Sequence, residues 1–189
     1  LQSSCSGKAL DIQWGAMYTP NTPLQLWDTN DTEAQKWHFT RYSGNIPTST
    51  YSKLTATGAA IDMTGGQTSN GTPIQLWSKN GSGAQVWRIE KQADGAYTII
   101  NAASGRPLDV RNAQFTNGSR IQIWNSNGSC AQKWNLIAKN DGKYEVLSAC
   151  SNTWALDVSG GKISTAGAPV QLYTRNGSGA QVWTLGTPW

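Results

Sequence analysis

Residues 72–87 read "TPIQLWSKNGSGAQVW", and residues 168–183 repeat this almost word for word as "APVQLYTRNGSGAQVW". Internal repeats decide a fold because each copy is one structural unit that packs on the next. In each copy an Asp is followed after 13 or 14 residues by a Gln, and an aromatic residue comes two positions after this Gln. The Trp of a Gln-x-Trp triplet follows the same Asp by 25 or 26 residues. This unit occurs four times: Asp11, Gln25, Trp27 and Trp37; Asp62, Gln75, Trp77 and Trp87; Asp109, Gln122, Trp124 and Trp134; Asp157, Gln171, Tyr173 and Trp183.

The composition excludes several kinds of partner. Charged residues make up 14 % of the 189 residues, and the net charge of +4 is spread along the chain without a basic run. This argues against nucleic acid as a partner. No stretch approaches 18 apolar residues, so we expect no membrane insertion. Ten Trp against two Phe is a bias that core packing alone does not require.

The order of turn and strand signals predicts an all-β fold. Asn-Gly pairs, which favour tight turns, separate short runs rich in β-branched and aromatic residues. No window of a dozen residues carries a helical apolar stripe that Gly, Pro or Asn-Gly does not interrupt. A strand beginning at a Tyr precedes the second, third and fourth repeats, at Tyr51, Tyr97 and Tyr144.

Strand alternation separates the aromatic residues into two groups. In "PIQLW", Ile74 and Leu76 face one side and Gln75 and Trp77 the other, because successive side chains of a strand alternate. The aliphatic side is the expected core face, which leaves the Gln and the aromatic residue outward. The same holds for Leu24 and Leu26, for Ile121 and Ile123, and for Val170 and Leu172. The indoles of the Gln-x-Trp triplets share a face with aliphatic residues, so Trp87, Trp134 and Trp183 are expected in the core.

An outward aromatic ring beside a carboxamide and a carboxylate suits a sugar. The ring can receive the C–H face of a pyranose, while Asp, Gln and Asn can bond its hydroxyls. Several shallow sites of this kind gain affinity together when the ligand is polyvalent. Repetition therefore favours a binding protein.

These motifs resemble the ricin-B-type lectins and the related family 13 carbohydrate-binding modules. The resemblance rests on "ALDV", "IDM" and "PLDV", on "VQLY", "IQLW" and "IQIW", and on the four Gln-x-Trp triplets, and it covers essentially the whole chain. It implies a β-trefoil of three four-stranded repeats, in which the Asp bonds sugar hydroxyls, the aromatic residue stacks on a galactose-like ring and a polar residue three positions later adds hydrogen bonds. The candidate carbohydrate-binding residues are Asp11, Gln25, Trp27 and Asn30; Asp62, Gln75, Trp77 and Asn80; Asp109, Gln122, Trp124 and Asn127; and Asp157, Gln171, Tyr173 and Asn176.

The chain departs from the family pattern in three ways. The Asn that often precedes the Gln of Gln-x-Trp and touches sugar is replaced by Ala34, Ala84, Ala131 and Ala180. The usual disulfide within each repeat is missing. Finally, four repeats exceed the three of one trefoil. We expect residues 48–189 to form a complete trefoil and residues 1–47 to be the last third of a preceding trefoil, or to pack on the neighbouring unit; a trefoil built from the first three repeats is the alternative.

Simpler roles are possible for the same residues. Each repeated Asp could cap a turn by accepting from backbone amides, and an outward Trp could pack across strands under a loop. We therefore expect one to three working sites. Gln85, Gln132 and Gln181 are expected to hold the Asp or a turn. A bridge between Cys130 and Cys150 would suit a secreted protein and leave Cys5 unpaired, but the sequence does not establish it.

Three function classes remain to be compared. A glycosidase needs two paired carboxylates, yet the acidic residues outside the repeats form no cluster, and no metal or cofactor is expected. A sugar-blind trefoil that binds proteins is the stronger alternative, supported by the four alanines. We favour a non-catalytic, extracellular carbohydrate-binding module that belongs to a larger chain such as a glycosidase, with a glycan or polysaccharide as its partner.

Overall fold

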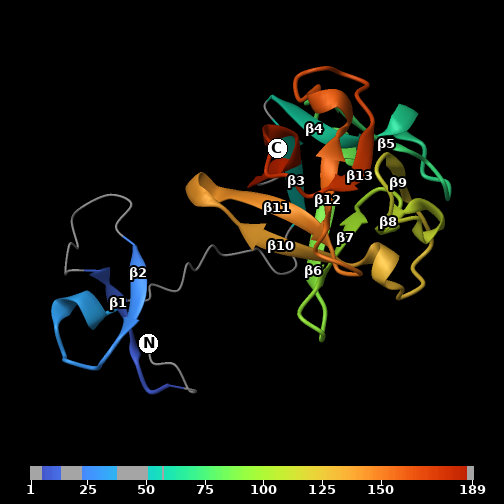
Figure 1. Cartoon of the computed structure of the whole chain (residues 1–189). Coiled ribbons are helices and arrows are strands. Elements are labelled where there is room, and N and C mark those ends of the chain that lie inside the picture. Colours follow the sequence, from blue (N-terminus) through green and yellow to red (C-terminus); the bar gives the residue numbers. More distant parts are fainter. Residues whose placement is uncertain (1–5, 14–22, 38–50, 57, 187–189) are drawn as a thin grey trace. The chain divides into compact units, whose positions relative to one another are not determined.

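The chain forms two compact units, Leu1–Ser43 and Gly44–Trp189. The computed structural model describes residues 6–13, 23–37, 51–56 and 58–186, with residues 51–55 described in their backbone only (Figure 1). All regular elements among these residues are β-strands or single turns of 3₁₀-helix, so the prediction of an all-β fold is confirmed.

The first unit contains one hairpin and one 3₁₀ turn among its described residues. Strand β1 (Ala9–Ile12) pairs with β2 (Leu24–Trp27), and η2 (Glu33–Gln35) follows. Leu24 and Leu26 are 55 % and 52 % exposed, so the described residues of the first unit do not cover the expected core face of this hairpin. A single two-stranded hairpin cannot bury its apolar side by itself.

The second unit is built around a closed barrel. Its twelve strands are β3 (Tyr51–Ala56), β4 (Ala59–Met63), β5 (Ile74–Ser78), β6 (Trp87–Lys91), β7 (Tyr97–Asn101), β8 (Leu108–Val110), β9 (Ser119–Ile123), β10 (Trp134–Ala138), β11 (Lys143–Ser148), β12 (Trp154–Val158), β13 (Val170–Thr174) and β14 (Val182–Gly186). Pairing runs from β3 to β6, β7, β10, β11 and β14, and β14 returns to β3. Because the ring closes on itself, these strands leave no free sheet edge.

The other six strands form three hairpins, β4–β5, β8–β9 and β12–β13, which bond to one another in a cycle. Gly71 donates to the carbonyl oxygen of Ile123 over 2.9 Å, Gly118 to Leu172 over 3.0 Å and Gly167 to Leu76 over 2.7 Å. Repeat two therefore contacts repeat three, repeat three contacts repeat four, and repeat four contacts repeat two. This pseudo-threefold closure is the arrangement of a β-trefoil, and it uses only residues of the second unit.

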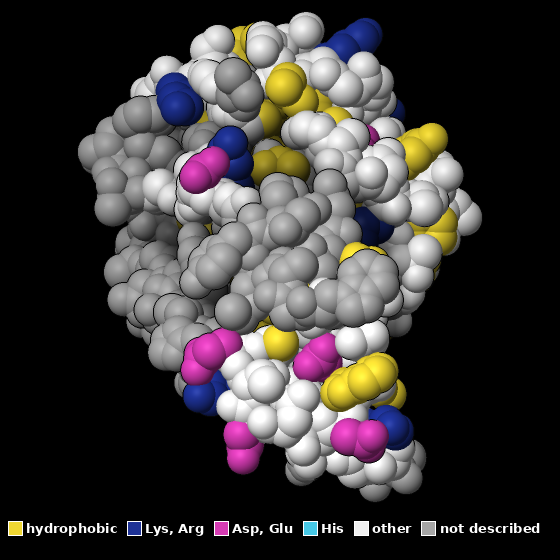
Figure 2. Space-filling view, turned by 60° about the vertical axis from the view of Figure 1, so that its left-hand side comes forward, with side chains coloured by type: hydrophobic (Ala, Val, Ile, Leu, Met, Phe, Trp, Pro, Cys, Tyr) yellow, Lys and Arg dark blue, Asp and Glu magenta, His cyan; other side chains and the backbone are white. Residues whose placement is uncertain are grey.

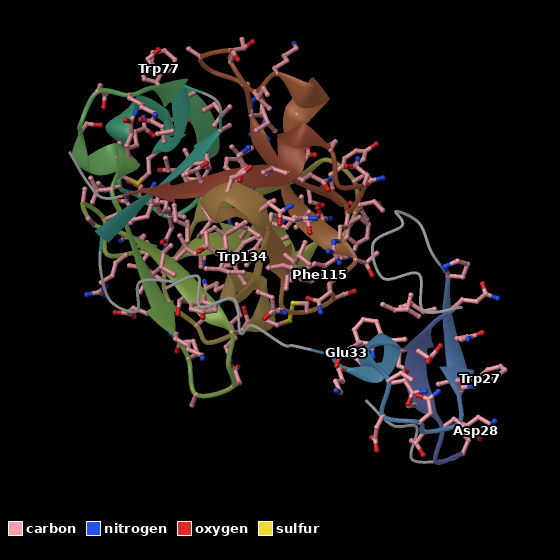
Figure 3. All side chains as sticks on the ribbon, turned by 90° about the vertical axis from the view of Figure 1, so that its left-hand side faces the viewer. Trp27, Asp28, Glu33, Trp77, Phe115 and Trp134 are labelled. Atoms are coloured by element: carbon pink, nitrogen blue, oxygen red, sulfur yellow. A yellow bond between two sulfur atoms is a disulfide. The ribbon has the colours of Figure 1, made fainter. Side chains whose placement is uncertain are left out.

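The expected core tryptophans are in the core. Trp87, Trp134 and Trp183 are fully buried, and Figure 3 shows Trp134 among the strands of the barrel. Their indole nitrogens donate to the carbonyl oxygens of the residues before the repeated Asp: Ile61 at 3.2 Å, Leu108 at 3.3 Å and Leu156 at 3.0 Å. Each indole thus fills the interior and also satisfies its only donor, which buried Trp requires.

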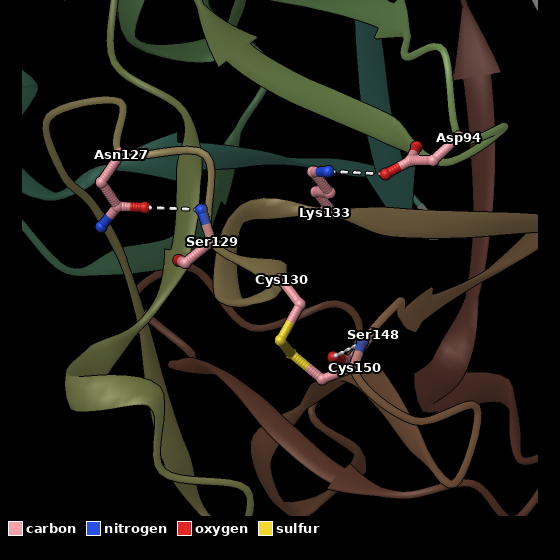
Figure 4. The surroundings of a disulfide bond; sticks show 7 residues. All are labelled: Asp94, Asn127, Ser129, Cys130, Lys133, Ser148 and Cys150. Atoms are coloured by element: carbon pink, nitrogen blue, oxygen red, sulfur yellow. Dashed lines mark hydrogen bonds and ion pairs between the residues drawn. A yellow bond between two sulfur atoms is a disulfide. The ribbon is translucent and has the colours of Figure 1, made fainter.

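A disulfide joins repeats three and four. Cys130 in η6 (Cys130–Gln132) is bonded to Cys150, which follows β11, and the two α-carbons lie 5.1 Å apart (Figure 4). The bridge spans 20 residues, for which chain entropy gives a stabilisation of about 3 kcal/mol. Beside it, Lys133 pairs with Asp94 of the preceding hairpin. Cys5 lies outside the described residues.

The surface carries few charges. On the face drawn in Figure 2, Lys and Arg side chains lie singly and are interspersed with Asp and Glu. No helix in the described part of the chain has the length and apolar character needed to cross a membrane.

Candidate functional site

Each repeated Asp is held by two glutamines. In repeat three, Gln122 donates to Oδ1 of Asp109 over 2.8 Å, and Gln132 donates to Oδ2 over 3.0 Å. Gln132 also donates to the carbonyl oxygen of Asn125 at 2.9 Å and accepts from the backbone N–H of Asn127 at 3.0 Å. The hairpin β8–β9 and the turn η6 are therefore tied together through one carboxylate.

The same cluster occurs in all four repeats. Gln25 and Gln35 hold Asp11, Gln75 and Gln85 hold Asp62, and Gln171 and Gln181 hold Asp157, with donor–acceptor distances of 2.8–3.1 Å. The four Asp side chains are only 4–5 % exposed. The prediction that Gln85, Gln132 and Gln181 hold the Asp is confirmed. The alternative that the Asp caps a turn through backbone amides is wrong, because these hydrogen bonds come from Gln side chains.

The aromatic residues of the second motif point outward. Trp77 is 42 % exposed, Trp124 is 41 % exposed and Tyr173 is 36 % exposed, and Figure 3 shows Trp77 projecting away from the ribbon. A methyl group on Gly71 would lie 3.7 Å from Trp124, and one on Gly167 would lie 3.8 Å from Trp77. The edge of each indole is therefore held against a glycine turn of the adjacent repeat, while much of the ring remains accessible.

The candidate Asn residues shape the loop after the aromatic strand. Oδ1 of Asn127 accepts from the backbone N–H of Ser129 over 2.9 Å (Figure 4), and Asn80 and Asn176 make the same bond to Ser82 and Ser178. The carboxamide NH₂ of these Asn residues bonds to none of the described residues. The loop geometry therefore uses the oxygen and leaves the two N–H donors available.

Two hollows bring the predicted residues together. One of about 530 Å³ in repeat two is lined by Asp62, Gln75, Trp77 and Asn80. One of about 350 Å³ in repeat three is lined by Asp109, Gln122, Trp124 and Asn127. Ala84 and Ala131 also line them, so a methyl group stands where the family often has an amide.

The sequence analysis did not identify two further residues that line each hollow. Gly65 and Gly66 line the hollow of repeat two with φ angles of 64° and 66°, in the left-handed region that favours glycine. Asn112 and Ala113 occupy these positions in repeat three, with φ angles of 55° and 51°, and both line that hollow. The signal was the Gly-Gly pair that follows the Asp by three residues in repeats two and four but not in repeat three.

Burial changes the titration of two of these carboxyls. Removal from water raises the pKa of Asp109 and of Asp157, and the hydrogen bonds from their glutamines oppose that rise without cancelling it. Among the residues that the structure describes, no three His, Cys, Asp or Glu side chains are placed to hold a metal ion.

Titration of individual carboxyls by NMR is expected to show Asp109 and Asp157 above, and Asp94 below, the ordinary Asp pKa. The Asp94 pKa is lowered by its hydrogen bond from Lys133. As the pH falls through the raised values, the folded chain binds protons before the unfolded chain does, so these two groups favour folding increasingly toward acid. Asp94 contributes the opposite slope and serves as the internal control; ordinary titration of Asp109 and Asp157 would contradict this account of their environment.

A family model for the ricin-type beta-trefoil lectin domain matches three overlapping stretches, residues 1–77, 33–124 and 83–173. The chain belongs to the ricin-type β-trefoil lectin family. A comparison with curated proteins found no match.

Solved structures place this ricin-type chain among known trefoils. ThreeFoil, a designed 3-fold symmetric protein, is 34 % identical with a TM-score of 0.68, over 71 % of this chain and 96 % of ThreeFoil. The exo-β-1,3-galactanase 1,3Gal43A from Clostridium thermocellum is 30 % identical with a TM-score of 0.68, over 74 % of this chain but only 30 % of the enzyme chain. A ricin B-like lectin of Macrolepiota procera, solved with lactose, is 23 % identical over 76 % of this chain and 99 % of its own, with a TM-score of 0.66, and shows the shared fold.

Proposed function

We propose that this chain is a non-catalytic carbohydrate-binding module that binds galactose-type or related glycans through several shallow repeated sites. The observation that carries the proposal is the hollow of repeat three, where an outward indole, a buried carboxylate and an unpartnered carboxamide NH₂ converge (Trp124, Asp109 and Asn127). A ring face offers stacking to the C–H side of a sugar, and the polar groups offer both acceptors and donors to its hydroxyls. The hollow of repeat two repeats this combination.

Membership of the ricin-type family supports a sugar as the ligand. Similarity to part of an exo-β-1,3-galactanase supports galactose-type sugars and a role beside a larger chain such as a glycosidase. Each of the two hollows is lined by a single carboxylate, whereas most glycosidases hold two at the scissile bond. This favours binding without catalysis.

The proposed organisation is a trefoil at 48–189 preceded by one further repeat at 1–47. Barrel closure between β3 and β14 and the cycle of hairpin contacts support a trefoil made from repeats two to four. The half-exposed pair Leu24 and Leu26 supports a first repeat that belongs to a second trefoil, since the equivalent pairs in the other repeats are buried. The disulfide supports an extracellular location, because such bonds persist in oxidising compartments.

A glycan array with the purified chain tests the function directly. Binding to galactose-type glycans is expected, and it should weaken about tenfold at each site that loses its aromatic ring, as in a variant carrying Trp77→Ala, Trp124→Ala and Tyr173→Ala. Ile137→Ala is the matched control, because Ile137 is also an exposed apolar residue, at 37 %, and lines neither hollow. Equal binding by the parent chain and the triple variant would refute aromatic stacking at Trp77, Trp124 and Tyr173.

One observation favours a second candidate, a sugar-blind trefoil that binds another protein. Both oxygens of each repeated carboxylate already accept from a Gln, and the Asp side chains are nearly buried. Their role would then be to hold the loops in place. A folded parent chain that binds no glycan on the array would favour this candidate.

A further inference from the structure

Repeat three differs from its neighbours at three positions beside its hollow. Arg111 stands where repeats two and four have Thr64 and Ser159, Asn112 stands where they have Gly65 and Gly160, and Arg120 stands where they have Pro73 and Pro169. Two arginines and one amide thus replace small or apolar residues in one repeat only.

The three substitutions line one additional hollow. It has a volume of about 320 Å³, and its lining includes Arg111, Asn112, Gln114, Asn117 and Arg120, with no acidic residue. We name it the arginine pocket. Asn112 lines both this pocket and the hollow of repeat three, so the two are neighbours across one side chain.

Asn112 lines the arginine pocket with its backbone in an uncommon conformation. Its φ angle of 55° lies in the left-handed region, which Asn tolerates better than most residues other than Gly. Ala113, at 51°, has no such tolerance. Uncommon conformations at non-glycine residues persist where the surrounding structure imposes them, and they concentrate at functional sites.

Three polar side chains of the arginine pocket have no partner among the described residues, whereas Asn117 in the same lining accepts hydrogen bonds from Thr174. Neither guanidinium forms an ion pair or a hydrogen bond with any described residue, and neither does the Asn112 side chain. Other arginines of the trefoil are engaged: Arg175 binds Glu145 through two nitrogens, and Arg106 binds Asn70, Asn125 and the Thr68 carbonyl oxygen. Two free guanidinium groups in a polar pocket are suited to a carboxylate or a sulfate, which accept paired N–H bonds.

We propose that the arginine pocket extends the site of repeat three and binds the anionic group of a sugar linked to the one that stacks on Trp124. This inference rests on the proposed lectin function and narrows it. The preferred ligand is then an acidic glycan that carries uronate or sulfate, with Arg111 and Arg120 bonding the anion and Asn112 bonding the bridging region. Repeats two and four lack these residues and take neutral sugars.

The test is isothermal titration calorimetry with lactose, lactose 3′-sulfate and digalacturonic acid. The chain carries Trp27→Ala, Trp77→Ala and Tyr173→Ala, so that Trp124 is the remaining stacking residue of the four motifs. At least one acidic ligand is expected to bind about three- to tenfold more tightly than lactose in low salt, and this preference should shrink in ~0.5 M NaCl. The two acidic ligands distinguish sulfate from carboxylate as the bound group.

Variants locate the effect. Arg111→Thr, which copies repeat two, and Arg120→Gln are each expected to remove much of the acidic preference while leaving lactose binding unchanged. Lys91→Gln removes the same charge from exposed β6, outside the lining of either hollow, and should leave the preference intact. The proposed role of the arginine pocket would be refuted if the preference for acidic ligands survived both Arg substitutions. It would also be refuted if Lys91→Gln reduced that preference as much as they do.

The outcomes separate this inference from the proposed function. Lactose binding through Trp124 without any preference for the acidic ligands would reject the arginine pocket and retain the lectin. If the folded parent chain bound none of the three ligands and no glycan on the array, both the arginine pocket and the lectin function would be rejected.

Discussion

Gln132→Leu is expected to lower the free energy of unfolding by about 4 kcal/mol, measured by urea denaturation. The substitution keeps the size of the side chain but removes three hydrogen bonds: to Asp109, to the Asn125 carbonyl oxygen and from the Asn127 N–H. The carboxylate of Asp109 then loses the donor to Oδ2 in a nearly buried place. An unsatisfied buried group costs about 1–3 kcal/mol, and more when it is charged, which makes this amide a principal support of the loop.

The matched control for this variant is Gln67→Leu. Gln67 is an exposed Gln in repeat two, and its substitution is expected to change the free energy of unfolding by no more than about 0.5 kcal/mol. If Gln132→Leu cost less than about 1 kcal/mol, the Asp–Gln cluster could not be the structural tie that its geometry indicates. The weakened loop should also bind glycans less well, because it carries Asn127.

Trp134→Ala is expected to lower the free energy of unfolding by about 3–5 kcal/mol, the usual cost of emptying a site filled by a large aromatic side chain. Trp134 is fully buried, and its indole nitrogen bonds the carbonyl oxygen of Leu108 next to Asp109. The substitution would therefore leave a cavity and an orphaned carbonyl oxygen at the residue that precedes Asp109, which lines the repeat-three hollow.

Trp124→Ala in the same repeat is the comparison that separates fold from function. Its ring is 41 % exposed, so the loss of stability should be smaller than that of Trp134→Ala, at about 2 kcal/mol, while glycan binding at that site falls about tenfold. Thermal and urea denaturation measure the first quantity and calorimetry the second. A large loss of stability from Trp124→Ala would show that the outward indoles serve mainly to pack the repeats together.

Much of this arrangement could be predicted because strand alternation is a local rule. It separated outward Trp77 from buried Trp87, although both are Trp in one repeat, and the fixed spacing brought Asp62 and Trp77 to one hollow. Alternation also identified the apolar side of β2, but whether that side is covered depends on two other hairpins. The exposure of Leu24 and Leu26 therefore concerns tertiary structure and not the strand.

Other features depend on contacts between distant segments. Three cysteines allow three pairings, and only the placement of Cys130 beside Cys150 selects one. The arginine pocket was missed because Arg111 and Arg120 lie nine positions apart on different sides of a turn, and neither forms a recognisable motif. Their significance appears only when repeat three is compared with repeats two and four.

The pairing of β3 with β14 has a mechanical consequence. Lys53 lies opposite Gly186 and Thr55 opposite Thr184, and Figure 1 shows the C-terminal end of the described chain beside β3. The polypeptide therefore enters and leaves the barrel along one pair of strands, β3 and β14, whose ladder of hydrogen bonds is called the seam below. A pulling force applied to both ends would load the hydrogen bonds of that seam one after another, so the trefoil should open by peeling at low force. The same seam would let a circular permutant join the two ends with a short linker and begin elsewhere, for example at the turn around Gly95.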